Sequence, residues 1–131
     1  DNIGVNFDPS HLFWQGMDPI ECVKALGDSI YHVHAKDTKI DKRNVALNGV
    51  LDTKHYGDIL NRSFVFRTVG YGHDDEFWKD LVSMLRLVGY DGAISIEHED
   101  GIMSVNEGFT KAASFLNNLI LKESAGEMWW A

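Results

Sequence analysis

Three short runs rich in β-branched and aromatic residues alternate with helical segments, and this alternation constrains the fold of the chain more than any other feature. The runs span residues 2–8, 29–36 and 92–99, and each is bounded by Gly, Asp or Asn. Such runs are typical of β-strands. Strands and helices that alternate at this spacing indicate βα units and a parallel sheet, so we expect an α/β fold.

Three segments between and after these runs have the periodicity of amphipathic helices. The first begins at Asp18 and Pro19 and ends at Gly27, the second spans residues 74–89, and the third opens with Ser104 and Glu107. An acidic or hydroxyl residue before the first turn and Gly after the last turn are the usual helix boundaries. The expected buried residues are Ile20, Val23 and Leu26, then Phe77, Leu81, Leu85 and Val88, and finally Phe109, Ala112, Leu116, Leu119 and Ile120.

Composition excludes several classes of function. The 131 residues suffice for one domain with its own core. A net charge of −8 argues against a surface that binds nucleic acid, and no apolar run is long enough to cross a bilayer. The single cysteine, Cys22, excludes an internal disulfide and fits a reducing compartment, so we expect a cytoplasmic protein. The chain starts inside a strand-like run without an initiator Met, and we expect it to be part of a longer protein.

Polar residues gather at the ends of the three expected strands. Side chains alternate across a strand, so His32, His34 and Lys36 share one face of the stretch "YHVHAKD". On the same reasoning, Asp8 and Glu97 lie on the polar faces of their strands at the depth of His34. Ligands of α/β folds bind at the carboxyl ends of parallel strands, so these side chains are expected to meet in one pocket.

Two carboxylates and one imidazole are ligands that suit Mn²⁺, Zn²⁺, Co²⁺ or Mg²⁺. The residues therefore predict a divalent-metal site formed by Asp8, His34 and Glu97. A simpler interpretation stays open, in which Glu97 is only an ion-pair partner of Lys36. His32 is expected to be a hydrogen-bonded core residue one layer below the pocket, and Lys36 with Asp37 could form a local ion pair.

Four stretches together carry a family resemblance: "NFDPSHLFWQG", "YHVHAKD", "FRTVGYG" and "GYDGAISIEHED". They resemble the sugar phosphate isomerase/epimerase family, which has a xylose isomerase-like (β/α)₈ barrel. The resemblance covers residues 2 to about 121 and implies the C-terminal portion of the barrel, since a whole barrel needs about 250 residues. This chain would supply the last three βα units, with residues 38–66 as a long loop or lid inserted after the second strand.

The resemblance also implies roles for individual residues. Asp8, His34 and Glu97 would bind the metal, and Glu97 would also be a catalytic acid/base carboxylate. His11, Arg67 and Lys36 would contact the substrate, and Trp14 would form an apolar wall against it, although a core Trp or an Arg in a surface ion pair is also consistent with the sequence. A fourth family ligand, a Glu on the preceding strand that is the second acid/base carboxylate, has no counterpart in the chain.

The implied reaction is metal-dependent isomerisation or epimerisation of a sugar or sugar phosphate. A carboxylate removes a proton next to a carbonyl, and the metal stabilises the enediolate that forms. Three alternatives stay open: dehydration of a keto-inositol at the same site, abasic-site endonuclease chemistry, which the acidic charge disfavours, and a non-catalytic assembly module. Three strands leave a sheet edge exposed, so we expect self-association or pairing with the missing N-terminal half of the barrel.

Overall fold

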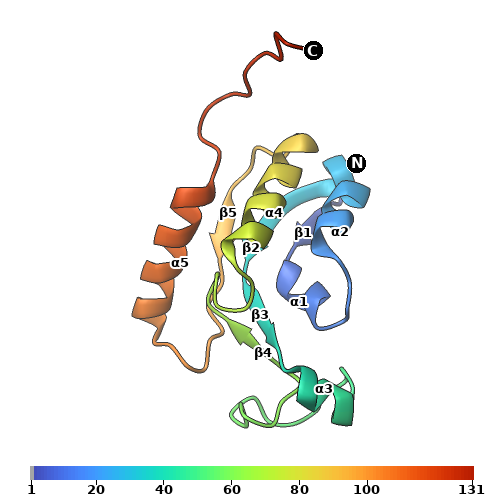
Figure 1. The fold of residues 1–131 in the computed structure, drawn as a ribbon, viewed down its shortest axis with the longest axis vertical. Helices are drawn as coiled ribbons and strands as arrows, with labels where there is room; N and C mark the ends of the chain where they lie inside the picture. The colour runs from blue at the N-terminus through green and yellow to red at the C-terminus, as the bar shows by residue number, and fades with distance from the viewer. Residues whose placement is uncertain (1) are drawn as a thin grey trace.

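The computed structural model describes residues 2–131, which form a three-stranded parallel sheet covered by helices (Figure 1). The strands are β1 (Val5–Phe7), β2 (Ile30–Ala35) and β5 (Ile94–Ile96), in the order β1-β2-β5. Both strand pairs are parallel, with Phe7 beside Val33 and Val33 beside Ile94. The prediction of βα units around a parallel sheet is therefore confirmed.

The three predicted helices are present, and two short helices that the sequence did not predict lie beside the first of them. Between β1 and β2 lie α1 (Pro9–Phe13), α2 (Pro19–Leu26) and a short 3₁₀ helix (Gly27–Ser29); α4 (Asp75–Leu87) precedes β5, and α5 (Val105–Leu119) follows it. The caps are those expected: Asp18 accepts from the Ile20 N–H at 2.9 Å, and Ser104 accepts from the Glu107 N–H at 3.2 Å. These side chains satisfy N–H groups that the first helical turn leaves without a partner.

The core lies between the sheet and the helices. Its buried members come from β1, β2, α2, α4 and α5, and they include Phe7, Val23, Ile30, Val33, Trp78, Leu81, Leu85, Ala112 and Leu116. The expected apolar face of α5 is wrong at two positions, because Phe109 is 41% exposed and Ile120 is 40% exposed. The helix packs through the small residues Gly108 and Ala112 and ends at Leu119, which leaves Ile120 beyond its last turn.

Residues 38–66 contain regular structure that sequence periodicity only partly indicated. Strand β3 (Asp37–Ile40) follows β2 almost directly and pairs antiparallel with β4 (Phe64–Arg67), and helix α3 (Lys42–Asn48) lies between them. The short strand expected at "SFVF" is therefore present, whereas β3 was not predicted. Three of its four residues are polar, so no hydrophobic alternation marks them as a strand.

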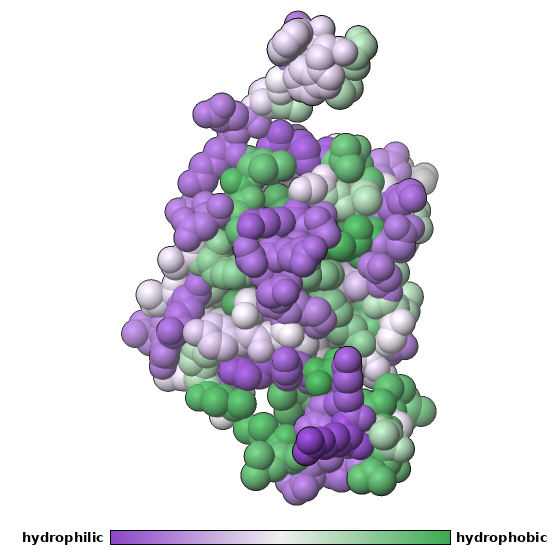
Figure 2. All heavy atoms as spheres, viewed as in Figure 1, coloured by the Kyte–Doolittle hydropathy of each residue, from purple (hydrophilic) through white to green (hydrophobic). Residues whose placement is uncertain are grey.

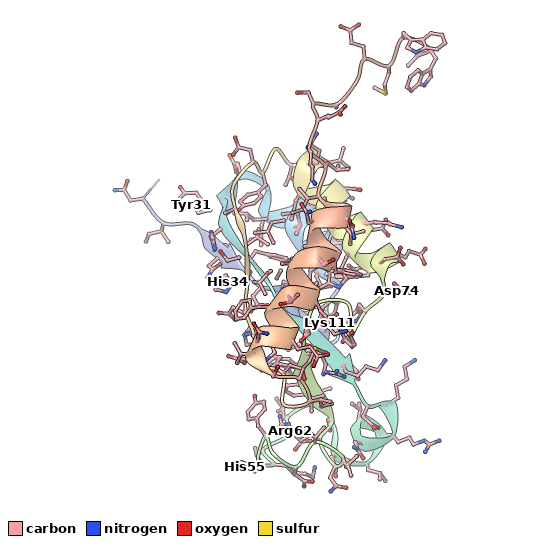
Figure 3. All side chains as sticks on the ribbon, turned by 90° about the vertical axis from the view of Figure 1, so that its left-hand side faces the viewer. Tyr31, His34, His55, Arg62, Asp74 and Lys111 are labelled. Carbon is pink, nitrogen blue, oxygen red and sulfur yellow. The ribbon has the colours of Figure 1, made fainter. Side chains whose placement is uncertain are left out.

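A buried arginine organises the part of this segment that follows α3. Arg62 donates from Nε to the Phe64 carbonyl at 3.1 Å and lies over the Tyr56 ring, 4.0 Å from its centroid. Asp52 accepts from the Ser63 N–H at 2.6 Å. Figure 3 shows Arg62 in this lobe at the end of the molecule, away from His34 on the sheet.

Several large apolar side chains of the same segment remain exposed, among them Leu47, Leu51 and Leu60. Hydrophobic residues accordingly gather around the end of the molecule that carries α3 (Figure 2). In the chain from residue 2 onward, no helix has both the length and the apolar character needed to cross a membrane.

Candidate metal centre

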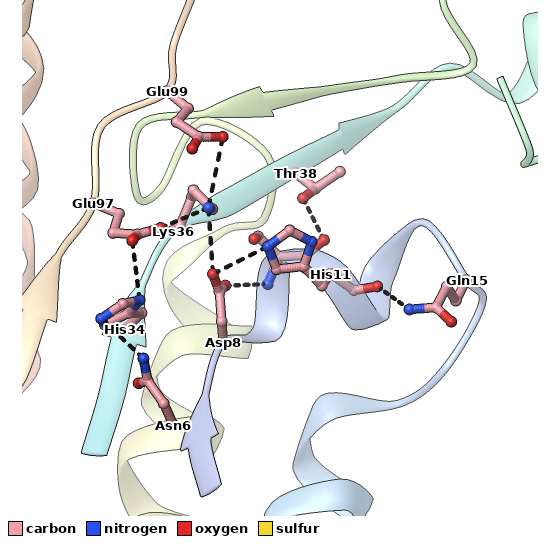
Figure 4. Close-up of polar contacts among 10 residues, drawn as sticks. Asn6, Asp8, His11, Gln15, His34, Lys36, Thr38, Glu97 and Glu99 are labelled. Carbon is pink, nitrogen blue, oxygen red and sulfur yellow. Dashed lines mark hydrogen bonds and ion pairs between the residues drawn. The ribbon is translucent and has the colours of Figure 1, made fainter. Parts of the chain in front are cut away.

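The polar ends of the three parallel strands converge on one point. Asp8 follows β1 directly, His34 lies near the end of β2, and Glu97 follows β5 directly. One ligand atom from each lies within 4.8 Å of the ligand atoms of the other two (Figure 4). Parallel pairing produces this convergence, because it brings the carboxyl ends of β1, β2 and β5 to the same edge of the sheet.

The backbone fixes one oxygen of Asp8 and leaves the other to face the centre. Asp8 is the N-cap of α1, and its Oδ1 accepts from the Ser10 N–H at 2.9 Å. Its Oδ2 lies 3.3 Å from the Lys36 Nζ and 3.6 Å from the His11 Nε2. The cap thus orients the carboxylate so that a second oxygen remains available to a cation.

His34 is held from both ring nitrogens. Its Nδ1 lies 3.1 Å from the Glu97 Oε1, and its Nε2 lies 3.3 Å from the Asn6 Nδ2. A divalent ion could use the nitrogen that faces Glu97. The Nε2–H group would then need an acceptor, as metal-binding imidazoles commonly have, so the Asn6 amide would turn its Oδ1 toward the ring in place of its Nδ2. The donor set of two carboxylate oxygens and one imidazole nitrogen fits Mn²⁺, Zn²⁺, Co²⁺ or Mg²⁺.

Lys36 places a positive charge inside this centre. The residue is 2% exposed, and its Nζ lies 2.6 Å from the Glu97 Oε2 and 3.6 Å from the Glu99 Oε2, besides the contact with Asp8. It also lies over the Phe66 ring, 4.8 Å from its centroid. Burial opposes the charged form, but the surrounding carboxylates outweigh it and raise the Lys36 pKa, so the ammonium remains charged.

The same ammonium sets the protonation of Glu97. Its hydrogen bond and charge lower the Glu97 pKa, against the opposing effect of partial burial, and His34 and His11 act in the same direction. Glu97 is therefore anionic at neutral pH. A metal ion would compete with Lys36 for oxygens of Asp8 and Glu97, because both carboxylates already face this cation.

The structure places the predicted substrate-binding residues at different distances from the centre. His11 lies beside it, and its half-exposed ring meets the Phe66 ring edge-on at 5.3 Å. Trp14 lies farther away, stacked on Phe64 of β4 with ring centroids 5.2 Å apart. Phe64 in turn meets Phe66 at 5.8 Å, so these two rings link Trp14 to Lys36 at the centre.

Arg67 is paired with a buried carboxylate rather than with a surface group. Its Nε lies 3.0 Å from the Asp100 Oδ2, which also accepts from the Thr68 N–H at 2.8 Å. Burial of Asp100 opposes ionisation, but the hydrogen bonds from Thr68, Ile102 and Arg67 outweigh it and lower the Asp100 pKa. These contacts attach the end of β4 to the loop after β5.

Asp37 forms no local pair with Lys36 but anchors the loop that precedes α4. Its Oδ2 accepts from the backbone N–H groups of Gly70, Gly72 and His73, at 2.9 to 3.1 Å, and from the indole N–H of Trp78 at 3.3 Å. A side chain at Gly72 would overlap the Asp37 carboxylate. Gly72 thus allows the backbone of this loop to approach the buried Asp37 carboxylate closely.

Sequence reasoning assigned no role to Asn6, Glu99 or Asp100. Asn6 and Glu99 lie two residues from Asp8 and Glu97, on the same strand faces, so the period of two was the available signal. Asp100 gave no such signal, because its partner Arg67 lies 33 residues away. His32 is hydrogen-bonded as expected, since its Nε2 lies 2.8 Å from the Ser95 Oγ, but it is partly exposed and does not belong to the core.

Comparison with known proteins agrees with this architecture. A family model described as a xylose isomerase-like TIM barrel matches residues 1–119. The uncharacterized protein YfiH of Bacillus subtilis (strain 168) is 42% identical over 118 residues, which are 90% of this chain and 38% of that protein. The crystal structure of a xylose isomerase domain protein from Planctomyces limnophilus matches 90% of the chain with a TM-score of 0.65 at 22% identity. The chain again spans 38% of that protein, so it corresponds to part of a barrel.

Proposed function

Because the chain belongs to the family of xylose isomerase-like TIM barrels, we propose that it forms the C-terminal part of a metal-dependent sugar isomerase or epimerase. The convergence of Asp8, His34 and Glu97 at the carboxyl edge of the sheet is the observation that supports this proposal. In this proposal the three residues hold one Mn²⁺, Zn²⁺, Co²⁺ or Mg²⁺ ion. A bound divalent ion would stabilise negative charge that develops on a substrate oxygen.

Glu97 is the base in this proposal. It is anionic, partly exposed and at the edge of the centre, so it can accept a proton from a carbon next to a carbonyl. A base works best when its pKa is near the working pH, and Lys36 keeps that of Glu97 lower. Movement of the ammonium toward a substrate oxygen would raise the proton affinity of Glu97, which gives Lys36 a positioning role.

The remaining residues orient the substrate. His11 is half exposed beside Asp8 and can donate to a hydroxyl group or accept from one. Arg67 lines a hollow next to the centre and keeps guanidinium N–H groups beyond its bond to Asp100. Trp14 supports the aromatic wall of Phe64 and Phe66.

The segment 38–66 serves as a cover over the substrate in the same proposal. Tyr56 from this segment stacks on Phe66 with ring centroids 6.0 Å apart, and Phe66 lies under Lys36. The segment thus contacts the centre through Phe66. The rest of the barrel, or a second copy of the chain, would complete the site from the side of β1.

Hydrogen exchange at carbon tests the proposal directly. The Mg²⁺-loaded or Zn²⁺-loaded chain is incubated with ketoses in deuterated water, and loss of the proton next to the carbonyl is followed by NMR. One base suffices for this exchange, so it does not require the second carboxylate. We expect exchange that Glu97→Gln abolishes and that Glu107→Gln, on an exposed face of α5, leaves unchanged.

Other outcomes would overturn the proposal. A metal-loaded chain that exchanges no carbon-bound hydrogen would indicate an assembly module. Release of water from a keto-inositol would indicate a dehydratase, and cleavage of DNA at an abasic site would indicate an endonuclease.

A further inference from the structure

A hollow of about 500 Å³ adjoins the metal centre, between the 38–66 segment and the loop after β5. Phe66 and Glu99 connect the two, since both line the hollow and both contact Lys36. Most of the remaining wall is apolar and consists of Tyr56, Ile59, Val65, Ile102, Met103 and Val105. Apolar walls with a few polar groups at one end are typical of small-molecule sites.

The hollow lies where TIM barrels that bind phosphorylated ligands commonly hold the phosphate. That position is formed by the loops after the last two strands of the barrel. In this chain those loops follow β2 and β5. The loop after β5 carries Glu97, Glu99 and Asp100, and His98 is the only residue in positions 97–103 that can become a cation.

Each cation near the hollow already has a partner. Arg62, whose guanidinium lies over the Tyr56 ring, donates to the backbone carbonyls of Lys54 and Phe64. Lys36 contacts Asp8, Glu97 and Glu99, and Arg67 is bound to Asp100. Lys111, which lies over the Tyr71 ring near Arg67, pairs with Glu107 at 3.7 Å. The Nε2 of His98 lies 3.2 Å from the Met103 carbonyl oxygen.

The balance of charge disfavours a phosphate ester. Four carboxylates surround the centre and the hollow, and two cationic side chains face them. A divalent ion at the centre would bring this set to neutrality. A phosphate dianion in the hollow would then meet Glu99 and Asp100, and the cations of residues 2–131 that lie near it already have partners. Its loss of hydration would therefore be poorly compensated.

We propose that the substrate of this site is an uncharged sugar or cyclitol rather than a phosphate ester. Its hydroxyl groups face the metal centre, and its C–H surface lies against Phe66 and Met103. This inference rests on the proposed function and specifies its substrate class.

Matched ligands test the inference on the Zn²⁺-loaded chain. Binding of D-fructose and D-fructose 6-phosphate is measured by saturation-transfer NMR, and metal content is measured in the same samples. We expect the uncharged sugar to bind at least about tenfold more tightly, a difference of about 1.4 kcal/mol. Equal or tighter binding of the phosphate ester, or binding of neither ligand to metal-loaded chain, would overturn the inference. Failure to bind metal would instead overturn the proposed function.

Two pairs of variants test whether the ligand binds in this hollow. Glu99→Lys introduces an unpaired cation into the hollow and should strengthen binding of fructose 6-phosphate about tenfold, whereas the same charge change at exposed Glu76 should not. Ile102→Trp fills the hollow from an exposed position and should weaken binding of fructose, whereas Leu87→Trp on α4 should not. Equal effects within either pair would place the ligand elsewhere and overturn the inference.

Discussion

The Nζ atom of Lys36 lies 2.6 Å from the Glu97 Oε2 and 3.3 Å from the Asp8 Oδ2, between two of the three candidate metal ligands. The chain therefore carries its own cation at the point where its strand ends bring carboxylates together. Without it, Asp8, Glu97 and Glu99 would repel one another at short range. Lys36 thus holds these carboxylates close together.

Replacing Lys36 by Met should raise the pKa of Glu97. Lys36 is the largest cause that lowers this pKa, so its removal lets the carboxyl group bind its proton at higher pH. Carbon-detected NMR of the Glu97 carboxyl group, titrated from neutral to acidic pH, measures the change. Lys79→Met removes an exposed ion pair with Asp75 on α4 and should leave Glu97 unaltered. If the Glu97 carboxyl group titrated with the same midpoint pH in both variants, Lys36 would not be the group that lowers its pKa.

Replacing His34 by Ala should weaken binding of Mn²⁺ or Zn²⁺ at least about tenfold, since even residues that only orient a ligand contribute tenfold or more. Plasma mass spectrometry of chain purified without chelator measures the metal that stays bound. Titration of the metal-free chain then measures the affinity. His55→Ala is the matched control, because His55 lies in the lobe away from the sheet (Figure 3). Equal metal binding by both variants would show that the centre is elsewhere.

Replacing Asp37 by Asn should destabilise the fold by about 3 kcal/mol, because an amide N–H₂ group would face buried N–H donors that now share a carboxylate. Urea unfolding followed by tryptophan fluorescence measures this, since Trp78 is one of the donors. Asp41→Asn changes the exposed N-cap of α3 and should cost less than about 0.5 kcal/mol, because Asn caps helices as well as Asp. Similar losses in the two variants would contradict an anchoring role for Asp37.

Stability should fall in acid partly through Asp100. Its pKa is lowered in the folded chain, so it stabilises the fold above its unfolded pKa of about 3.9 and loses this contribution as pH falls through the folded value. The difference in melting temperature between the wild type and Asp100→Asn should therefore be largest near neutral pH and shrink below about pH 4. A difference that is independent of pH would argue against an ionised Asp100.

The chain should associate in solution, because within residues 2–131 neither β1 nor β5 has a strand on its outer edge. An apolar hollow of about 420 Å³ also opens beside β1, lined by Val5, Phe7, Leu12 and Met17 among others. Sedimentation velocity over a range of micromolar concentrations should show species larger than a monomer. A single monomeric species throughout that range would contradict this expectation.

Local physical chemistry allowed much of the fold to be predicted. The strand positions follow from β-branched runs, and the helix starts at Asp18, Asp74 and Ser104 follow from capping chemistry that acts within four residues. Parallel pairing followed from the alternation of strands and helices. The candidate ligands Asp8, His34 and Glu97 could be named in advance, because strand alternation and the rule for carboxyl ends depend only on sequence positions.

The sequence by itself thus determined which residues form the three-stranded parallel sheet and which polar side chains end its strands. Only the tertiary structure decided the partners of the buried charges, since these partners lie far away along the chain. The sequence left the ion pair of Lys36 with Glu97 open only as an alternative to a metal site. Lys36 meets Glu97 at a separation of 61 residues, Arg67 meets Asp100 at 33, and Asp37 meets Trp78 at 41. Burial makes an unpaired charge costly, so folding pairs the charges that it buries. No local sequence pattern encodes which opposite charge is brought close.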